Sequence, residues 1–228
     1  MLPFKITSQK PLEEYSLEEL KSGAVFLVDK PLDWTSFQVV NKLRGTIRKL
    51  HKIKKIKVGH AGTLDPLATG LLIICVGNKT KEIELFQGQE KEYTGTFVIG
   101  ATTPSFDLET EIEQRFPVDT INESDLRNAV KILTGDIVQY PPVFSAVKID
   151  GKRAYESARK GEEVKLRPRK VNISKFEIDI SEFPKVHFTI VCSKGTYIRS
   201  IASDFGKSLK NGAYLSSLRR QRIGEYSI

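Results

Sequence analysis

Apolar and polar residues recur along this 228-residue chain with the two periods that distinguish strands from helices. Short apolar or alternating runs predict strands at residues 24–28, 71–76, 91–99, 143–149, 171–180 and 186–192. Helical spacing predicts helices at residues 122–133, 153–160 and 196–209, besides one that Ser36 would cap and whose apolar face would hold Phe37, Val40, Leu43, Ile47 and Leu50. Hairpins, one of them turning at Asp150-Gly151, connect the strands in place of regular helical crossovers. We therefore expect an α+β fold with a central, largely antiparallel mixed sheet flanked by helices.

The composition places the chain among ordinary globular proteins. Hydrophobic residues make up 39% of it and charged residues 28%, which is typical of a soluble protein. Apolar runs fall far short of the ~20 residues that a membrane span needs, and the N-terminus lacks the pattern of a secretion signal. Because the sequence shows neither an internal repeat nor a clear linker, we expect residues 1–228 to form a single domain in the cytoplasm.

Sequence motifs for cofactor or metal binding are absent. The chain has no phosphate-binding loop, no dinucleotide-binding glycine pattern and no zinc-protease motif. Its histidines, His51, His60 and His187, are too scattered to suggest a metal cluster, and both cysteines lie at the ends of apolar runs, as buried free thiols do. We therefore expect neither a cofactor nor a metal.

The net charge of +8 is concentrated in one segment, residues 42–57. That segment holds eight cations and no acid, and the 28 basic residues elsewhere balance the 28 acidic ones. No Asp or Glu occurs between Asp33 and Asp65. Such a run is either a solvated face or a surface for an anionic partner, of which a phosphate backbone is the commonest.

One carboxylate, Asp65, lies within Gly59-His60-Ala61-Gly62-Thr63-Leu64-Asp65-Pro66-Leu67-Ala68-Thr69-Gly70, directly before an apolar run. Glycine permits positive φ, and Pro66 biases Asp65 toward extended geometry. The motif indicates a stiff loop that holds one acid at the mouth of a buried strand. A solvated turn would use the same residue types.

This motif resembles the signature of TruB-type tRNA pseudouridine synthases, in which the essential aspartate occupies the position of Asp65. Further segments resemble motifs of that family in the same order along the chain: Val28-Asp29-Lys30-Pro31, Lys91-Glu92-Tyr93, Pro141–Lys148, Cys192–Arg199 and Tyr214–Arg220. The resemblance covers roughly residues 24–222. It implies the pseudouridine synthase fold and the isomerisation of uridine to pseudouridine at position 55 in the T-loop of tRNA. It also implies a monomer whose partner is the T-arm.

The family pattern implies a catalytic set of three residues. The reaction breaks the C1′–N1 bond and rejoins the uracil through C5, so it needs no redox cofactor. Asp65 would act as nucleophile or as base at the sugar, and both roles stay open here. Arg199 would orient this carboxylate, since a guanidinium binds carboxylates in a fixed geometry. Tyr93 would stack on the uracil and help to remove the C5 proton.

Four further residues are implied in binding the flipped nucleotide. His60 would occupy space in the T-loop or hold that nucleotide, and Tyr197 and Leu218 would contact the uracil. Lys30 would act at the same site, although a Lys-Pro at the end of a strand is equally often structural.

The sequence departs from the family pattern in three places. The chain stops six residues after Arg222, where relatives commonly continue into a small RNA-binding domain. The segment between Ser36 and His60 is longer and more basic, and we expect residues 42–57 to supply phosphate contacts instead. Phe144 stands where a tyrosine is common. The alternative functions are a non-catalytic RNA-binding or RNA-folding module, and non-specific binding to nucleic acids or anionic surfaces.

Overall fold

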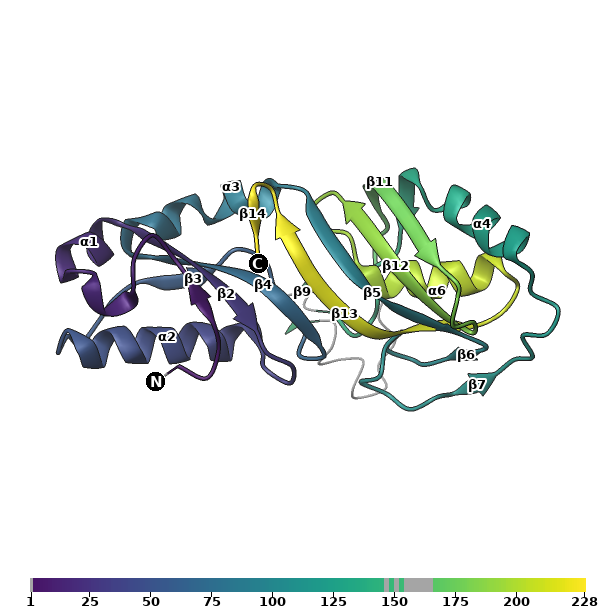
Figure 1. Ribbon diagram of the computed structural model, residues 1–228, viewed down its shortest axis with the longest axis horizontal. Helices are drawn as coiled ribbons and strands as arrows, with labels where there is room; N and C mark the ends of the chain where they lie inside the picture. Colours follow the sequence, from purple (N-terminus) through teal and green to yellow (C-terminus); the bar gives the residue numbers. More distant parts are fainter. Residues whose placement is uncertain (1, 146–147, 150–151, 154–165) are drawn as a thin grey trace. The chain divides into compact units, whose positions relative to one another are not determined.

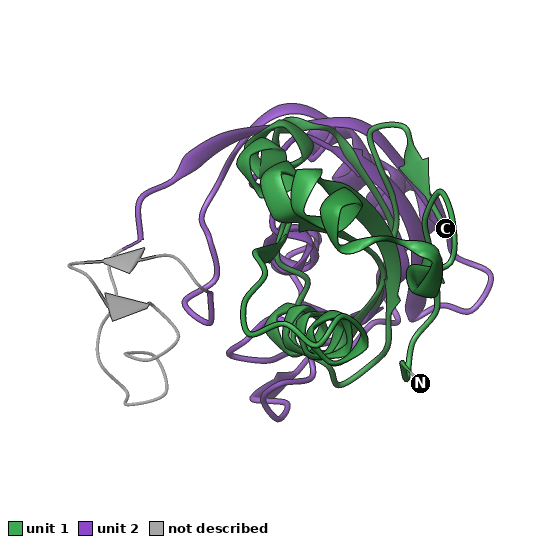
Figure 2. Cartoon of the chain, turned by 90° about the vertical axis from the view of Figure 1, so that its left-hand side faces the viewer, with its two compact units in different colours: residues 1–93, 218–228 green, residues 94–217 purple. Residues whose placement is uncertain are grey.

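The computed structural model describes residues 2–145, 148–149, 152–153 and 166–228 (Figure 1). The chain forms two compact units, which Figure 2 shows in different colours. Unit 1 comprises Met1–Tyr93 and Leu218–Ile228, and unit 2 comprises Thr94–Ser217. Strands β5 (Lys91–Ile99) and β13 (Ala213–Ile223) contribute residues to both units. That the whole chain acts as one catalytic domain stays a prediction.

Unit 1 is built around β4 (Ala68–Val76), the strand that follows the Asp65 motif. One side of β4 pairs with β2 (Ala24–Lys30) along its length, antiparallel. Its other side pairs with β13 at residues 68–70, in parallel, and with β3 (Val58–His60) at residues 74–76, antiparallel. The remaining elements are β1 (Ile6–Thr7), η1 (Leu12–Glu14), α1 (Leu17–Ser22), α2 (Ser36–Leu50), η2 (Gly77–Glu82), α3 (Ile83–Gly88) and β14 (Tyr226–Ser227). The motif therefore lies in a loop from β3 to the start of β4.

Helix α2 buries three of the five residues predicted for its apolar face, Val40, Leu43 and Ile47, and leaves the other two exposed. Its buried positions are Ser36, Val39, Val40, Leu43 and Ile47, which face the strand residues of the unit 1 core. Phe37 is 62% exposed and Leu50 42% exposed. Phe37 is one residue, or ~100°, around the helix from the buried Ser36, and Leu50 ends the helix.

The predicted cap of α2 was also wrong by one residue. Thr35 is the N-cap, and it forms a capping box with Gln38. Ser36 is the first helical residue and is buried. Because its hydroxyl is not used as a cap, it is available to the loop that carries Asp65.

Unit 2 has the strand order β13-β5-β12-β11-β8. Its elements after β5 are β6 (Ala101–Thr102), β7 (Gln114–Arg115), α4 (Glu123–Ile132), β8 (Gly135–Gln139), β9 (Lys148–Ile149), β10 (Lys152–Arg153), β11 (Arg169–Asp179), β12 (Lys185–Cys192) and α6 (Ile198–Ser208). Four phenylalanines, Phe97, Phe176, Phe188 and Phe205, meet in its core, and the first stacks on the third with 4.3 Å between ring centroids.

Most of the predicted elements are confirmed. Of the strand expected at residues 143–149, only β9 forms a strand among the described residues, and residues 143–145 are bends. The strand at residues 91–99 has the expected limits, and β9 pairs with β10 in the antiparallel hairpin expected around residues 150–151. The expected helix at residues 153–160 falls almost entirely outside the described residues. Neither β8 nor the eleven-residue strand β13 was predicted as a strand. The fold is α+β, with a mixed sheet in which β4 and β13 form a parallel pair.

Cys75 and Cys192 are buried thiols, as expected. Within the described ranges, no helix is both long and apolar enough to cross a membrane.

Candidate active site

The loop that carries Asp65 is held through its backbone by four neighbouring elements. Each of five consecutive carbonyls in it accepts a hydrogen bond: Gly62 (3.1 Å) and Thr63 (3.4 Å) from the Arg220 guanidinium, Leu64 (3.0 Å) from Ser36 Oγ, Asp65 (3.0 Å) from the amide of Ala68, and Pro66 (3.3 Å) from Lys30 Nζ. Pro66 also accepts from the amide of Asp33 at 2.9 Å. The donors come from β13, α2, β4 and β2 with the turn after it. A stiff loop before a buried strand is therefore confirmed, and it positions the half-buried Asp65.

Arg220 is the residue that the sequence reasoning missed. It lies on β13 with only 1% of its surface exposed, and its Nε also donates to the carbonyl of Leu71 at 2.7 Å. Gly70 makes this approach possible, because its φ is +102° and a Cβ there would overlap the backbone of Arg220. The signal in the sequence was an arginine within a partly apolar strand, which pattern reasoning assigns to a solvent-facing position.

Lys30 lies at the same loop. Its side chain is fully buried at the end of β2, and Nζ donates to the carbonyls of Pro31 (2.9 Å), Trp34 (2.6 Å) and Pro66 (3.3 Å). Burial lowers the pKa of Lys30 to about 8, while the negative charge of Asp65 acts to raise it. The Lys30 ammonium and the Asp65 carboxylate are therefore within electrostatic reach of each other.

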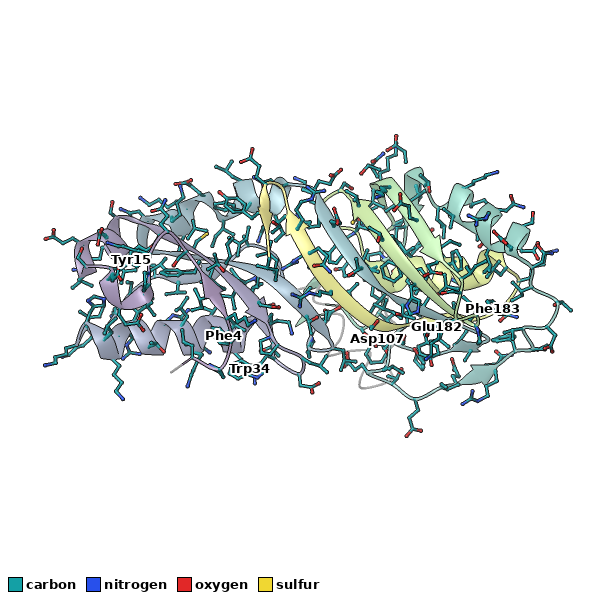
Figure 3. The ribbon with its side chains drawn as sticks, in the orientation of Figure 1. Phe4, Tyr15, Trp34, Asp107, Glu182 and Phe183 are labelled. Atoms are coloured by element: carbon teal, nitrogen blue, oxygen red, sulfur yellow. The ribbon has the colours of Figure 1, made fainter. Side chains whose placement is uncertain are left out.

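Aromatic packing supports the turn that accepts this ammonium. Phe4 packs edge-on against Trp34, with 5.8 Å between ring centroids (Figure 3). Because Trp34 supplies the shortest of the carbonyl contacts to Lys30, this packing helps to fix the acceptor.

Two more of the predicted residues flank the loop. His60 is the last residue of β3, immediately before the loop, and burial lowers its pKa. Leu218 pairs with Ala68 where β13 meets the start of β4. Tyr93, on β5, belongs to the same unit and is 8% exposed. Unit 1 thus places Lys30 and Leu218 beside the Asp65 loop and His60 in the strand that leads into it.

Tyr197 and Arg199 belong to unit 2, at the start of α6. Tyr197 is the N-cap residue, and Gln139 of β8 holds its backbone: the Tyr197 amide donates to Oε1 at 2.8 Å, and Nε2 donates to the Tyr197 carbonyl at 3.1 Å. The guanidinium of Arg169 lies over the tyrosine ring, 5.2 Å from its centroid. Unit 2 therefore fixes both the backbone and the ring of Tyr197.

Arg199 is buried, and unit 2 orients its guanidinium. Nη1 donates to the carbonyls of Phe144 (2.9 Å) and Ser105 (3.3 Å), and Nε lies 3.5 Å from Oδ2 of Asp107, which Figure 3 labels. Asp107 is the second residue that the sequence reasoning missed, because nothing in the sequence distinguishes it from the other acids between residues 107 and 125. That Arg199 also orients Asp65 stays a prediction.

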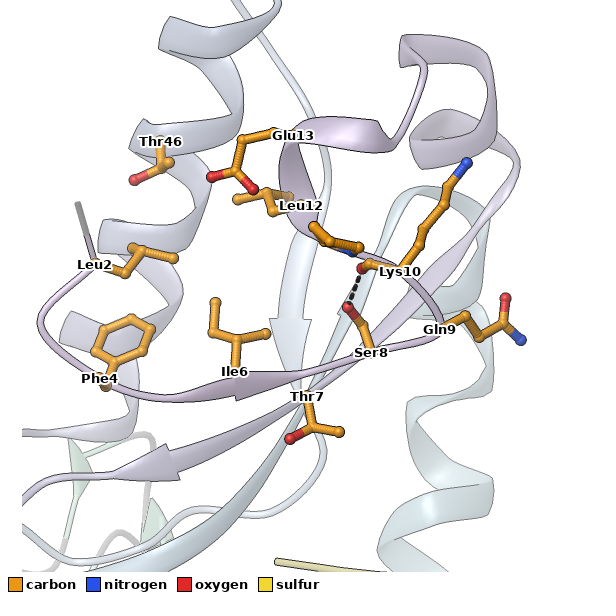
Figure 4. A pocket seen from close by; sticks show the side chains of 11 residues that line it. Leu2, Phe4, Ile6, Thr7, Ser8, Gln9, Lys10, Leu12, Glu13 and Thr46 are labelled. Carbon is orange, nitrogen blue, oxygen red and sulfur yellow. Dashed lines mark hydrogen bonds between the residues drawn. The ribbon is translucent and has the colours of Figure 1, made fainter.

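A separate hollow in unit 1 involves none of the predicted site residues. It has a volume of about 640 Å³ and is lined by the N-terminal segment, including Leu2, Phe4 and Leu12, and by Thr46 of α2 (Figure 4). A hydrogen bond of 2.7 Å from Ser8 Oγ to the carbonyl of Lys10 stiffens one wall. The Asp65 loop therefore stays the candidate site, and this hollow is separate from it.

Comparisons of the sequence with a family model and with curated proteins both find pseudouridine synthases. The model of the TruB family pseudouridylate synthases (N-terminal domain) matches residues 48–198. A tRNA pseudouridine synthase B of Flavobacterium johnsoniae is 58% identical over 212 residues, which cover 92% of this chain and 93% of that protein. The same enzyme of Parabacteroides distasonis is 52% identical over 91% of this chain and 88% of its own.

Solved structures share the fold at lower identity. A chain of the Cbf5-Nop10-Gar1 complex has a TM-score of 0.66 at 24% identity over 99% of this chain, which spans 60% of the length of that one. A chain of an H/ACA RNP bound to a substrate RNA has a TM-score of 0.64 at 23% identity, again over 99% of this chain and 59% of its own. At this identity the likeness concerns the fold alone.

Proposed function

Because this chain belongs to the TruB family of pseudouridylate synthases, we propose that it modifies the uridine at position 55 in the T-loop of tRNA, with Asp65 as the essential carboxylate. It is an RNA pseudouridine synthase, an isomerase that converts uridine to pseudouridine in tRNA. The observation that carries the assignment of Asp65 is the loop in which five consecutive carbonyls are hydrogen-bonded. Such restraint fixes the position of a reacting group before the substrate arrives.

The proposed chemistry needs one ionised carboxylate at the sugar. The C1′–N1 bond breaks, the uracil turns, and C5 bonds to C1′; C5 then loses a proton and N1 carries one, so that product and substrate have the same atoms. Asp65 acts either as the nucleophile at C1′ or as the base at the sugar. We assign Arg199 to orient this carboxylate and Tyr93 to stack on the uracil and assist the loss of the C5 proton.

The target base must leave its stack before it can react, which costs a few kcal/mol. We assign His60, Tyr197 and Leu218 to the flipped nucleotide. Lys30 has no exposed surface, so we assign it to holding the carbonyl of Pro66, next to Asp65. We further propose that the enzyme engages the T-arm as a monomer in the cytoplasm, in keeping with the tRNA-directed names of its bacterial relatives.

The test compares the wild type with Asp65→Asn on a tRNA transcript, followed by mapping of pseudouridine at each uridine. Asp33→Asn is the matched control, because Asp33 is exposed and its hydrogen bond to the loop comes from its backbone amide, which the substitution keeps. We expect modification at position 55 with the wild type and the control, and none with Asp65→Asn. Pseudouridine formation by Asp65→Asn would refute the role of Asp65, and binding without modification by all three proteins would favour a non-catalytic RNA module.

A further inference from the structure

Residues 42–57, here called the basic segment, form an exposed cationic surface on unit 1. Seven of its eight cations are exposed: Lys42, Arg48, Lys49, Lys52, Lys54, Lys55 and Lys57. Arg44 is half-buried and donates to the carbonyl of Val58 at 3.0 Å, so it ties the segment to β3. None of the eight forms an ion pair with an acid in the part of the chain that the structure describes. The charge of this surface is therefore not neutralised locally.

The basic segment starts on a helix that is anchored at the Asp65 loop. Ser36, in the first turn of α2, is hydrogen-bonded to Leu64, the residue before Asp65. From there α2 rises 1.5 Å per residue, so Lys49 lies about 20 Å along the helix axis from the loop. The solvent face of α2 thus leads from the loop to the cluster of lysines in residues 52–57.

The apolar side of this segment is already occupied. Val40, Leu43 and Ile47 of α2 are buried in the unit 1 core, and Ile56 packs against the same core. A helix that binds a lipid surface needs an apolar face free to enter the membrane. Leu50, 42% exposed, adds one apolar side chain and not a continuous apolar face. Charge is therefore the main feature that this surface offers to a partner, as in binding to a phosphate backbone.

We propose that the basic segment binds the phosphate backbone of the tRNA substrate, with contacts that begin about 9 Å (Lys42) and continue to about 20 Å (Lys49) along α2 from the loop that holds the uridine. The proposal rests on the proposed function, which supplies an RNA at this unit. It assigns the excess positive charge of the chain to a phosphate-binding surface that is separate from the pocket for the flipped base.

The test neutralises Lys52, Lys54, Lys55 and Lys57 together by substitution with Gln. Binding to tRNA is measured between 50 and 200 mM salt, in proteins that also carry Asp65→Asn so that no turnover occurs. The matched control neutralises four lysines that each have an acidic partner within 4 Å: Lys79, Lys175, Lys185 and Lys207. It removes the same charge from sites where that charge is already compensated.

The parent protein here carries Asp65→Asn alone. If each of the four lysines contacts one phosphate, the negative slope of log affinity against log salt is less steep by about 3 in the fourfold variant. The parent then loses about 60-fold more affinity than the variant between 50 and 200 mM salt. We expect the control to keep the slope of the parent. An unchanged slope in the fourfold variant would overturn the proposal, as would equal effects of variant and control, or preferential binding of the segment to vesicles of anionic lipid.

A separate assay with Asp65 intact distinguishes this proposal from the proposed function. The fourfold variant still forms pseudouridine once its concentration exceeds its weakened Kd. If the wild type forms none, the proposed function fails; if both form it and the salt slope is unchanged, only the further inference fails.

Discussion

The substitution Arg220→Met tests whether one buried cation holds the loop that carries Asp65. Methionine keeps an unbranched chain but removes the charge and all five N–H donors. The carbonyl of Leu71, in a residue with no exposed surface, then loses the bond that it receives from Nε. The carbonyls of Gly62 and Thr63 belong to half-buried and exposed residues, so water can replace their donor.

These contacts set the size of the effect. A buried carbonyl left without a donor costs about 1–3 kcal/mol, and each of the other two bonds contributes about 0.5–1.5 kcal/mol. The variant has no guanidinium whose burial would cost desolvation energy, and this offsets part of the loss. We expect a net loss of about 3 kcal/mol, which lowers the Tm of a chain of this length by about 6–12 °C.

The assay combines thermal unfolding with single-turnover formation of pseudouridine below the Tm of each protein. We expect Arg220→Met to slow the reaction about 10- to 100-fold, because a displacement of about 1 Å at a reacting group costs that much. Arg220→Lys keeps the charge and should recover part of both losses. Arg222→Met is the control on the same strand, where the arginine pairs with Glu90 and Glu92 on a partly exposed surface and contributes about 0–1 kcal/mol. If Arg220→Met melted within 2 °C of the wild type and turned over at the same rate, the cation would not hold the loop.

Two further predictions concern Lys30 and Asp107. The pKa of Lys30 is about 8 in the folded protein and 10.5 as the ordinary value, so the ammonium loses its charge as the pH rises through about 8; we expect kcat/KM to fall above pH 8. Between about pH 8 and pH 10.5 the unfolded chain binds more protons at Lys30 than the folded one, so the contribution of Lys30 to the free energy of unfolding rises with pH. The fall in kcat/KM should therefore occur in folded protein. A fall that only tracked unfolding would contradict the role of Lys30. Asp107→Asn weakens the buried pair with Arg199. We expect a lower Tm and, in steady-state kinetics, a loss in kcat that is larger than the change in KM. An unchanged kcat would show that Arg199 needs no orientation by Asp107.

Elements with one clear period could be predicted from the sequence. The strand at residues 91–99 alternates, and the run before Val76 is continuously apolar because both faces of β4 pack into core clusters. The loop with Asp65 was equally readable, since glycines and a proline around one acid favour a restrained turn. Each of these features is determined by residues close together in the sequence.

Features that depend on distant partners could not be predicted in this way. A helical wheel places Phe37 and Leu50 on the apolar face of α2, but the sheet covers only the stripe from Ser36 to Ile47, and the sequence does not show where that cover ends. The edge strand β8 has a polar, weakly alternating sequence that resembles a loop. Local pattern reasoning fails wherever the neighbouring surface decides what is buried.

The two cations below the Asp65 loop show the same limit at the site itself. Pattern reasoning treats lysine and arginine as exposed, because burying a charge costs several kcal/mol unless its donors are satisfied. Here Lys30 and Arg220 are each satisfied by three backbone carbonyls, and three of the six belong to loop residues Gly62, Thr63 and Pro66. The cations stay buried because the loop presents these carbonyls, and the loop keeps its conformation in part because the cations donate to them. Loop shape and cation burial therefore form one cooperative arrangement, which makes the position of Asp65 a property of unit 1 itself, whatever Arg199 adds from unit 2.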